Sequence, residues 1–572
     1  MASDDKQLKI VAPSNFKMIK DLRLRKDLKM LPCPYMKPET SLRYYQTVGS
    51  LNMLMSNRML LGDSPGTGKT IQTISTQAVL KHKDPTMKFL VATIKSSKRQ
   101  WGKEFAKFSQ GMTYHVLQDD YKPIGGKAKL TGFKAREAQY KDFKDVDVLI
   151  TGYHPIKEDY KLLVECRGPN FMVVFDECQE FKNEKTKAYL GACHLSERAV
   201  RVVGLSATPI KNRLLEFYHI LAVLVPGVFP GITRFKQIFC QEKLVAIPAK
   251  GGKRYVKQVV GYKNLDMFRA SIEPYFLARA TQDVSDELPK LIARRVEVEL
   301  SDVQRKLYAE ALSGVIYQKR VKQKLYDFME VLKAAGTPPT LAQRDTLIAL
   351  KEKYDESMMD DAMAKNKGAA LTFCQQIANG PGWIGEEGSS PKEDEFRRLV
   401  ADELASEKII VFTRFESGIE RLSNILKEEG IKFARVSGKE NGKQREDAMM
   451  AFQDLEGDTR VIFITNAGSA AINLQAASVE IFYDTPWSFG DLCQTIGRAQ
   501  RIGSIHANVL VIHLVTEGTI DEHVLDVLGE KKWLTDQIMG DIALGALEFG
   551  PTEVTFVEEQ GDTDALFRKV FR

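Results

Sequence analysis

One stretch of the sequence has the residue types and the spacing needed to bind the phosphates of a nucleotide. Residues 60–70 read LLGDSPGTGKT and lie between an apolar run and a helix-like segment. In a loop of the type G-x-x-x-x-G-K-[ST], backbone N–H groups converge on the phosphates. The lysine neutralises the charge of the β- and γ-phosphates, and the Ser or Thr hydroxyl holds Mg²⁺. We interpret the stretch as a complete loop of this type. Its candidate ligands are Asp63, Gly66, Thr67, Gly68, Lys69 and Thr70.

An acidic pair follows an apolar run further along the chain. Residues 171–175 read FMVVF and precede Asp176 and Glu177. We expect Asp176 to hold Mg²⁺ through its water shell and Glu177 to polarise the attacking water. Such pairs are common by chance, and the upstream phosphate loop is what favours the catalytic interpretation.

Two arginines form the third candidate group. Residues 494–501 read QTIGRAQR, so Arg498 and Arg501 share one face of an expected helix and could reach a γ-phosphate across a cleft. Taken alone, the segment would be a surface helix with two solvated arginines.

Two blocks of alternating strand-like and helix-like segments would position these residues. The strand-like runs are 89–93, 146–150, 171–175 and 202–205 in the first block and 409–412, 461–464, 479–483 and 509–512 in the second. Nearly continuous apolar strands are typical of parallel sheets covered by helices on both faces. We therefore predict an α/β fold with two such domains.

The segment between the blocks has a different pattern. Residues 244–248 and 255–262 flank Gly251 and Gly252 and predict a hairpin, and Lys- and Leu-rich helical stretches follow. Residues 380–391 are rich in Gly, Ser and Pro and are the best candidate for a linker. Past about Leu544 the composition becomes acidic and loose.

Composition limits the class of protein. The 572 residues are 44% hydrophobic and 27% charged, as in soluble globular proteins, and the net charge of +7 is only weak support for nucleic-acid binding. The seven cysteines lack CxxC spacing, so we expect no metal site built from cysteines. Neither a signal peptide nor a membrane-length apolar run is present, so we expect no membrane association and a cytosolic or nuclear location. Residues 17–29 are basic and could meet a phosphate backbone, although a solvated helix face is the simpler interpretation.

In their order along the chain, these motifs and several others resemble those of helicase superfamily two. The additional motifs are LRYYQ at 42–46, KSSKRQW at 95–101, TGY at 151–153, LSATP at 205–209, VFTR at 411–414 and residues 465–474. Within that superfamily the chain looks like the Swi/Snf group of DNA translocases, on DECQEFKN at 176–183, ATPIKN at 207–212, LPK at 288–290, SPK at 390–392 and YDTPW at 483–487. Residues 239–290 are similar to the compact branch of annealing and fork-remodelling enzymes.

This resemblance implies two RecA-like lobes with ATP and Mg²⁺ between them and a largely helical insertion. The implied divisions are a basic segment at 1–40, the first lobe at 41–225, insertions and linker at 226–392, the second lobe at 393–544 and a tail at 545–572. Gln46 would read the adenine, and Arg498 and Arg501 would complete catalysis when the cleft closes.

The resemblance also implies coupling and nucleic-acid residues. The residues that couple the ATP site to nucleic-acid binding would be Gln179, Ser206, Thr208, Gly468, Asn473 and Gln494. The residues in contact with nucleic acid would be Lys95, Ser96, Lys98, Thr151, Thr413, Arg414, Thr465 and Asn466. Such contacts meet phosphates, so binding to double-stranded or branched DNA would be sequence-independent. We expect a monomer, and we expect Trp101 and Trp487 to be packing residues rather than base-stacking platforms.

The sequence departs from the group at two places. Cys178 and Gln179 replace the more usual Ala and His, and residues 468–471 read GSAA where a glycine-rich run is common, which puts the efficiency of coupling in doubt. The favoured function is an ATP-driven translocase on double-stranded DNA. The alternatives are a strand-separating helicase on DNA or RNA, an ATPase-dead scaffold that clamps DNA, and a factor acting on RNA polymerase.

Overall fold

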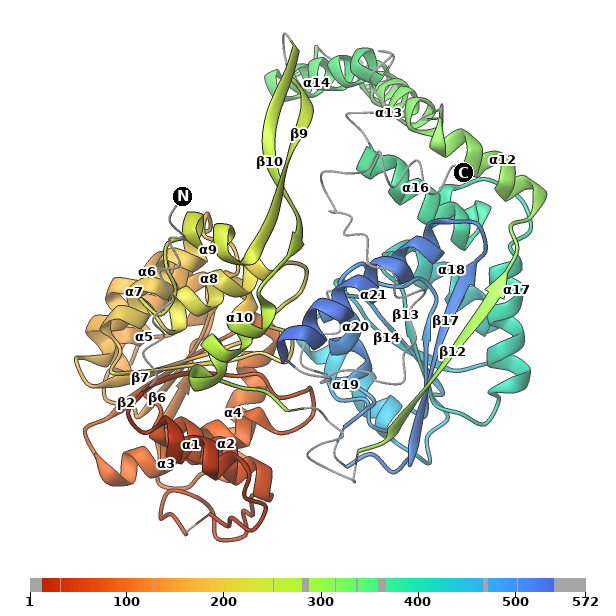
Figure 1. Ribbon diagram of the computed structural model, residues 1–572. Coiled ribbons are helices and arrows are strands. Elements are labelled where there is room, and N and C mark those ends of the chain that lie inside the picture. Colours follow the sequence, from red (N-terminus) through yellow and green to blue (C-terminus); the bar gives the residue numbers. More distant parts are fainter. Residues whose placement is uncertain are drawn as a thin grey trace.

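Two parallel sheets, each covered by helices, form two lobes that lie side by side (Figure 1). The computed structural model describes residues 13–539 except 31, 127, 250–251, 280–287, 314, 336–337, 358–366, 467–471 and 502. The two-lobed parallel α/β fold predicted from the alternating pattern is confirmed.

The first sheet has the strand order β11-β1-β8-β7-β2-β6-β3, and all its pairs are parallel. Its strands are β1 (Arg58–Leu61), β2 (Lys88–Thr93), β3 (Tyr114–Val116), β6 (Val148–Gly152), β7 (Phe171–Asp176), β8 (Arg201–Leu205) and β11 (Phe276–Leu277). The apolar run before the phosphate loop is β1, and the four runs predicted for the first block are β2, β6, β7 and β8. The short pair β4 (Asp120–Tyr121) and β5 (Leu130–Thr131) lies outside this sheet.

The second sheet has the order β12-β17-β16-β13-β15-β14 and is also parallel throughout. Its strands are β12 (Lys290–Val298), β13 (Ile409–Phe412), β14 (Phe433–Val436), β15 (Val461–Ile464), β16 (Val479–Phe482) and β17 (Asn508–Thr516). The four runs predicted for the second block are β13, β15, β16 and β17.

Both faces of the central strands are buried, and these strands are nearly continuous apolar runs, whereas the edge strands β3, β12 and β14 are partly exposed. In β7, Val173 and Phe175 join one core cluster, and their neighbours Met172 and Val174 join another on the opposite face. Successive side chains of a strand point to opposite faces, so a strand covered on both sides needs apolar residues at every position. The same alternation divides the core of the second lobe between its two faces.

Helices cover the sheets and carry the insertions. In the first lobe they are α1 (Phe16–Arg23), α2 (Tyr44–Met55), α3 (Lys69–Lys83), α4 (Lys98–Phe108), α5 (Gly132–Asp142), α6 (Tyr153–Arg167), α7 (Lys187–Arg198), α8 (Leu214–Leu224), α9 (Ile232–Phe239) and α10 (Leu265–Ile272). Beyond it they are α12 (Asp302–Leu312), α13 (Val315–Ala334), α14 (Leu341–Ser357), α16 (Lys367–Asn379), α17 (Pro391–Arg398), α18 (Glu416–Glu428), α19 (Gly442–Gln453), α20 (Phe489–Ile496) and α21 (Ile520–Met539). Single turns are η1 (Lys95–Ser97), η2 (Cys178–Phe181), η3 (Glu273–Tyr275), η4 (Pro381–Ile384) and η5 (Leu399–Glu403). No helix among these described residues is long and apolar enough to cross a membrane.

The predicted hairpin is confirmed and projects from the first lobe (Figure 1). It consists of β9 (Cys240–Ala249) and β10 (Gly252–Tyr262), which pair in antiparallel fashion. The Lys- and Leu-rich stretches predicted to follow it form the long helices α12, α13 and α14.

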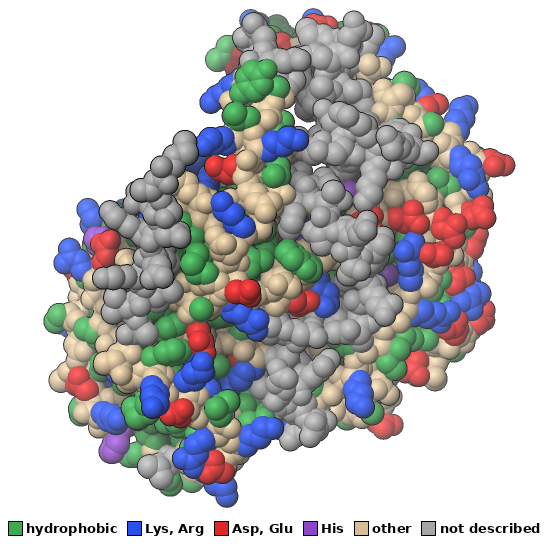
Figure 2. All heavy atoms as spheres, viewed as in Figure 1, with side chains coloured by type: hydrophobic (Ala, Val, Ile, Leu, Met, Phe, Trp, Pro, Cys, Tyr) green, Lys and Arg blue, Asp and Glu red, His purple; other side chains and the backbone are tan. Residues whose placement is uncertain are grey.

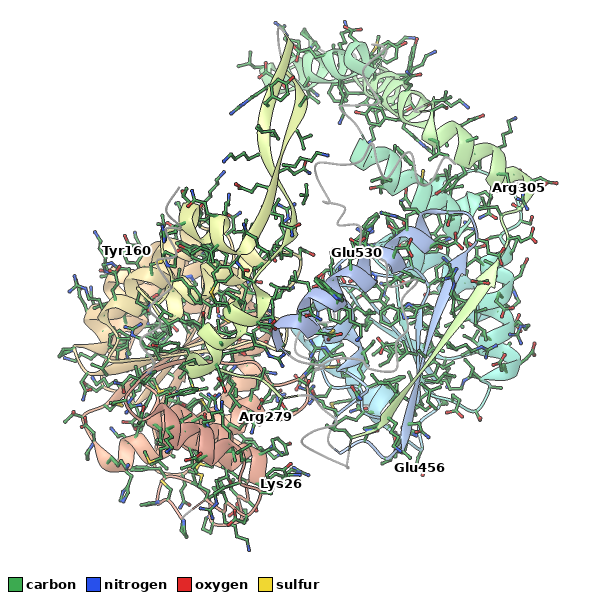
Figure 3. All side chains as sticks on the ribbon, viewed as in Figure 1. Lys26, Tyr160, Arg279, Arg305, Glu456 and Glu530 are labelled. Atoms are coloured by element: carbon green, nitrogen blue, oxygen red, sulfur yellow. The ribbon has the colours of Figure 1, made fainter. Side chains whose placement is uncertain are left out.

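The insertion predicted at 226–392 also supplies a strand to each sheet. β11 extends the first sheet beside β1, and β12 pairs with β17 along nine residues of the second sheet. The chain therefore passes from one lobe to the other between Leu277 and Lys290. Helix α21 passes back, since Val524 and Leu528 lie in a core cluster of the second lobe while Leu534 and Ile538 lie in one of the first. Glu530 of α21 is labelled in Figure 3 where the helix lies between the lobes.

The segment predicted as a linker at 380–391 is partly packed against the second lobe. Pro381, Trp383 and Ile384 are buried, and the Trp383 indole stacks on the ring of Tyr483 with centroids 5.2 Å apart. The Trp383 Nε1 donates to Glu393 Oε1 at 2.9 Å. Residues 385–389 are exposed, so only this middle part of the segment is solvated, between a packed turn at 381–384 and the buried Ser390.

Part of the basic segment predicted at 1–40 is packed rather than solvated. Arg23 donates from Nε to Asn52 Oδ1 at 2.9 Å and from Nη1 to the Glu273 carbonyl at 3.0 Å. Burial lowers the pKa of Arg23 to about 10. This arginine therefore anchors α1 on the first lobe.

Candidate active site between the lobes

A cavity of about 450 Å³ lies between the lobes at the phosphate loop. The first lobe lines it with Gln46, Gly66, Gly68, Lys69, Thr70, Asp176 and Glu177, and the second with Asn473, Gln494, Arg498 and Arg501. All five residues predicted to be catalytic therefore meet in one cavity. They come from segments more than 300 residues apart in the sequence.

The phosphate loop connects β1 to α3 through backbone conformations that favour glycine. Gly66 and Gly68 have φ of +78° and +82°. The left-handed conformation at Gly68 turns the chain into α3, whose N-terminal N–H groups would face the phosphates. The Lys69 ammonium bonds the carbonyls of Asp63 at 2.7 Å and Ser64 at 3.1 Å. Burial lowers the pKa of Lys69, while the carboxylates of Glu177, Asp63 and Asp176 oppose that shift.

Gln46 braces the loop from α2. Its Nε2 donates to the Thr67 carbonyl at 3.1 Å, and its Oε1 accepts from the Arg43 backbone N–H at 3.0 Å. A Cβ placed on Gly68 would lie 2.6 Å from Gln46 Nε2, so glycine is required for this approach. Thr67 is buried, and its hydroxyl donates to the Ser64 carbonyl at 2.8 Å, so its side chain supports the loop from within.

Asp63 departs from its predicted role. Counting back from Gly68-Lys69-Thr70 puts Asp63 where the G-x-x-x-x-G-K-[ST] pattern has its first glycine, so the loop is not complete in the sense predicted. The Asp63 side chain does not line the cavity, and its carboxylate is fully buried against Arg279. Arg279 Nε lies 2.9 Å from Asp63 Oδ1, and Arg279 Nη2 lies 2.5 Å from Asp63 Oδ2.

Arg279 follows β11 and also contacts two helices beside the loop, α2 and α3. Its Nη1 donates to the Tyr45 carbonyl at 2.6 Å and its Nη2 to Gln72 Oε1 at 3.2 Å. The residue is labelled in Figure 3, on the side of the first lobe that faces the second. Sequence reasoning missed it because Arg279 is 216 residues from Asp63 and belongs to no local pattern.

Asp176 ends β7 next to the cavity and is held by two donors. Its Oδ2 accepts from the Thr93 hydroxyl at 2.8 Å and from Trp101 Nε1 at 2.7 Å. Burial and the adjacent Glu177 raise the pKa of Asp176 to about 6, and these two hydrogen bonds and Lys69 oppose the shift. Trp101 is buried as predicted for a packing residue, but its indole N–H also orients the acid. Sequence analysis did not predict this second role, nor any role for Thr93.

The donor set at this point fits Mg²⁺. The Thr70 hydroxyl and the Asp176 carboxylate are oxygen ligands on one cavity, and Mg²⁺ commonly takes one or two protein oxygens with waters and phosphate oxygens. A cation there would stabilise the ionised form of Asp176, whose pKa burial has raised. In the part of the chain that the structure describes, no cluster of three or more His, Cys, Asp or Glu side chains offers a metal site.

Glu177 adopts a left-handed backbone conformation, with φ of 52° and ψ of 51°. A non-glycine residue there costs of the order of 1 kcal/mol, which the surrounding contacts must offset. Glu177 Oε2 accepts from Gln179 Nε2 and, at 3.1 Å, from Gln494 Nε2 of the second lobe. The general base predicted for the first lobe is thus hydrogen-bonded across the cleft.

The predicted coupling residues Gln179, Ser206 and Thr208 are connected to Glu177 by hydrogen bonds. Gln179 Oε1 accepts from the Ser206 hydroxyl at 2.6 Å, and Ser206 Oγ accepts from the Thr208 backbone N–H at 3.1 Å. The Gln179 amide therefore donates toward Glu177 and accepts from Ser206, as the departure from histidine allows. Gly468 lies outside the described residues.

The second lobe touches the phosphate loop directly. A Cβ placed on Gly66 would lie 2.8 Å from Arg501 Cγ, and one placed on Gly497 would lie 2.4 Å from Pro65 Cβ. Lys211 of the first lobe and Asp491 of the second form an ion pair at 2.9 Å. Contact this close puts the structure in a closed arrangement of the lobes.

Arg498 and Arg501 are turned into the cavity. Arg498 is only 8% exposed, and its Nη1 lies 3.4 Å from the Ile472 carbonyl. Arg501 Nη1 lies 3.2 Å from the same carbonyl and also donates to Asn473 Oδ1. Burial and the charge of Arg501 lower the pKa of Arg498 to about 10. These hydrogen bonds go to neutral oxygens, so the pair retains positive charge for a phosphate.

The predicted nucleic-acid residues are only partly available. Lys95 and Ser96 are exposed, and Lys95 pairs with Asp119 at 2.8 Å. Lys98 is half-buried and donates to the Leu117 carbonyl at 2.7 Å. In the second lobe Asn466 is exposed, and the Arg414 Nη1 donates to Gln375 Oε1.

Three threonines predicted to contact nucleic acid have buried side chains. Thr151 and Thr413 are fully buried, and Thr465 is 5% exposed. The Thr413 hydroxyl donates to Asp484 Oδ2 at 2.7 Å, so it orients the motif from within. In this arrangement of the lobes, contacts at these positions would have to come from the backbone.

Two family models match this chain, one of them over more than half of its length. The family model described as "SNF2-related domain" matches residues 44–347, and the model described as "Helicase conserved C-terminal domain" matches residues 391–503. A Caenorhabditis elegans protein, "SWI/SNF-related matrix-associated actin-dependent regulator of chromatin subfamily A containing DEAD/H box 1 homolog", is 25% identical over 90% of this chain and 54% of its own length. An "Uncharacterized ATP-dependent helicase" of Mycoplasma pneumoniae is 26% identical over 88% of this chain and 42% of its own length.

The chain thus spans about half the length, or less, of the curated relatives it matches. Among solved structures, the "Sulfolobus solfataricus SWI2/SNF2 ATPase core in complex with dsDNA" matches at 23% identity and a TM-score of 0.38, over 90% of this chain and 95% of that one. The fold assignment rests on the strand order and parallel pairing of this chain's own sheets.

Proposed function

Since this chain belongs to the SNF2-related domain family of helicase-type ATPases, we propose that it couples ATP hydrolysis to movement along double-stranded DNA, thereby remodelling branched DNA or protein-DNA complexes. The observation that carries the proposal is the hydrogen bond between Gln494 and Glu177 across the cleft, at 3.1 Å. It makes the geometry of the general base depend on the position of the second lobe.

The residues of the cavity divide the work of hydrolysis between the lobes. Lys69 and the N–H groups at the start of α3 would hold the phosphates, while Thr70 and Asp176 would hold Mg²⁺, which supplies charge neutralisation when bound. Glu177 would accept a proton from the attacking water. Arg498 and Arg501 would stabilise the charge on the transferring phosphoryl group, and they reach it only while the lobes are closed.

An arginine supplied from a second body accelerates nucleotide hydrolysis by about 10³–10⁵-fold in related enzymes. A ligand that binds the closed arrangement more tightly than the open one would therefore raise turnover. The ratio of its two affinities sets the upper limit of that increase. Duplex DNA lying across both lobes is the ligand we propose. Its contacts would be to phosphates, so stimulation should be independent of sequence and sensitive to salt.

The proposal is tested by measuring ATP turnover alone and with linear duplex, single-stranded, forked and four-way-junction DNA. Stimulation by duplex-containing DNA together with triplex displacement supports a translocase. Strand separation without triplex displacement would identify a helicase instead, and no stimulation by any DNA would contradict the proposal.

Lys69→Ala provides the matched inactive control. Its loss of the phosphate-binding ammonium should abolish turnover with every DNA, because Mg²⁺ alone would then have to neutralise the charge on the β- and γ-phosphates. Residual phosphate release by this variant would measure contaminating ATPase.

A further inference from the structure

The β9–β10 projection and its base concentrate positive charge outside the active site. Residues 236–263 contain seven Lys or Arg residues and a single acid, Glu242, a net charge of +6 compared with +7 for the whole chain. Figure 2 shows Lys, Arg and apolar side chains together along the described part of the projection. The phosphate loop and the motifs of the cleft use none of them.

Cations lie on both faces of the hairpin. Directly paired residues of an antiparallel ladder share a face, so Lys257 lies with its partner Leu244 on one face. Lys243 lies with its partner Gln258 on the other face. Tyr255 stands on the face of Lys257 and is 66% exposed, while Leu244 is 63% exposed.

The base of the hairpin adds a basic hollow of about 390 Å³. Its charged lining consists of Lys236, Lys243, Lys257, Lys263 and Glu242. The Lys257 ammonium lies 3.8 Å from the Glu242 carboxylate and stays 70% exposed, so the one acid in the hollow does not neutralise the four lysines.

The projection is anchored firmly enough to hold these groups in place. Phe239 is fully buried at its root, packed against Phe235 and Phe268. The Lys263 backbone N–H donates to the Phe239 carbonyl at 3.0 Å, and Asn264 Nδ2 donates to the Ile238 carbonyl at 2.8 Å. The hairpin thus leaves the lobe from a closed, packed base.

An isolated two-stranded ribbon is at best marginally stable, and its unpaired edges are normally covered or charged. Strands of 10 and 11 residues reach about 30 Å at roughly 3.3 Å per residue, which exceeds the width of a DNA groove. The major groove of B-DNA, about 12 Å wide, admits a two-stranded ribbon, with phosphates along both walls. A hairpin with cations on both faces can contact the phosphates of both walls of this groove. The major groove of A-form RNA is too narrow to admit the hairpin.

We propose that the β9–β10 hairpin is a second duplex-DNA contact, which enters the major groove and meets phosphates through Lys243, Lys257, Arg254, which is exposed on β10, and the basic hollow. This inference rests on the proposed function, because the same duplex would also lie across the two lobes. The hairpin would then add affinity and hold the duplex in register with the lobes, without reading base sequence.

The test compares the wild-type chain with a triple variant, Lys243→Gln, Arg254→Gln and Lys257→Gln. The measurement is duplex-DNA binding by fluorescence anisotropy over a series of salt concentrations. Removing one cation from a phosphate should reduce the slope of log K against log salt by about 0.9, so we expect a slope smaller by about 2–3 and at least tenfold weaker binding at about 0.1 M salt. The matched control neutralises three exposed lysines of α5 and α6, Lys134, Lys141 and Lys161, and should leave the slope unchanged.

A second variant replaces residues 241–261 by a short glycine-rich turn, which the hydrogen bond between Lys263 and Phe239 makes feasible. It also removes Lys250 and Lys253, so the slope should fall by at least as much as in the triple variant. An unchanged slope and affinity in both variants, with wild-type binding intact, would overturn the hairpin proposal and leave the proposed function standing.

If the wild-type chain neither binds duplex DNA nor is stimulated by it, the proposed function itself fails. An equal decrease in affinity for duplex RNA of the same sequence would overturn insertion into the groove. A decrease restricted to duplex DNA supports the proposal.

Discussion

Removal of Arg279 should both destabilise the first lobe and weaken nucleotide binding. The guanidinium makes two contacts to the fully buried Asp63 carboxylate and one to the Tyr45 carbonyl. Arg279→Ala would leave that carboxylate buried without its counter-charge. Breaking a buried pair from one side costs about 3–5 kcal/mol. At about 2–4 °C per kcal/mol for a domain of this size, the melting temperature of the first lobe should fall by roughly 6–20 °C.

A double-mutant cycle separates the pair from the packing around it. Asp63→Ala in the Arg279→Ala background removes the orphaned carboxylate, so the double variant should be more stable than Arg279→Ala alone. The assay is urea unfolding of all four proteins, together with KM and kcat for ATP. We expect a coupling energy of about 2 kcal/mol or more and a larger change in KM than in kcat, because the loop shifts while Glu177 and the arginines remain. Additive effects of the two substitutions, or an unchanged KM, would refute this account of Arg279.

The remaining predictions concern the chemistry in the cleft. Glu177→Gln should preserve ATP binding and lower turnover by at least about 10²-fold, and hydrolysis at the normal rate would show that the general base is another group. Arg501→Ala should keep the affinities for ATP and for duplex DNA within about threefold of wild type. It should lower DNA-stimulated turnover by about 10³-fold, measured by phosphate release. Since metal binding requires an ionised carboxylate and the pKa of Asp176 is raised to about 6, turnover at subsaturating Mg²⁺ should fall as pH drops through about 6. The Thr93 hydrogen bond lowers that pKa, so Thr93→Val should move the acid limb of the pH profile to higher pH, and an unmoved limb would exclude Asp176 as its origin.

The predicted nucleic-acid contacts show where sequence motifs are limited. The positions could be matched by resemblance, but Thr151 and Thr413 are fully buried, while Lys95 and Ser96 are exposed. A motif gives the order of residues along the chain. It does not say whether a hydroxyl faces solvent or, like that of Thr413, donates to a neighbouring carboxylate inside the lobe.

Asp63 illustrates a second limit. The spacing around Lys69 and Thr70 predicts a phosphate loop with Asp63 among its ligands. The structure instead pairs its carboxylate with Arg279, which is 216 residues away. A sequence pattern treats a residue by its neighbours along the chain, whereas burial and partner determine what its charge can do.

By itself, the sequence determined the elements whose formation depends on local chemistry. Continuous apolar runs required strands buried on both faces, Gly66 and Gly68 allowed the turn into α3, and the pair of strand-like segments around Gly251 and Gly252 specified a hairpin. Each of these depends on side-chain periodicity or backbone conformation within a few residues, so no knowledge of the partner segments was needed.

Only the tertiary structure decided which distant groups meet. It brought Arg498 and Arg501 to the cavity of Lys69, bonded Gln494 to Glu177 across the cleft, and packed Trp383 where a linker was expected. Such contacts are made by segments up to several hundred residues apart, and they form because two lobes with separate sheets bury complementary surfaces. The free energy of that burial depends on the shapes of both partners at once, and no local stretch of sequence contains it.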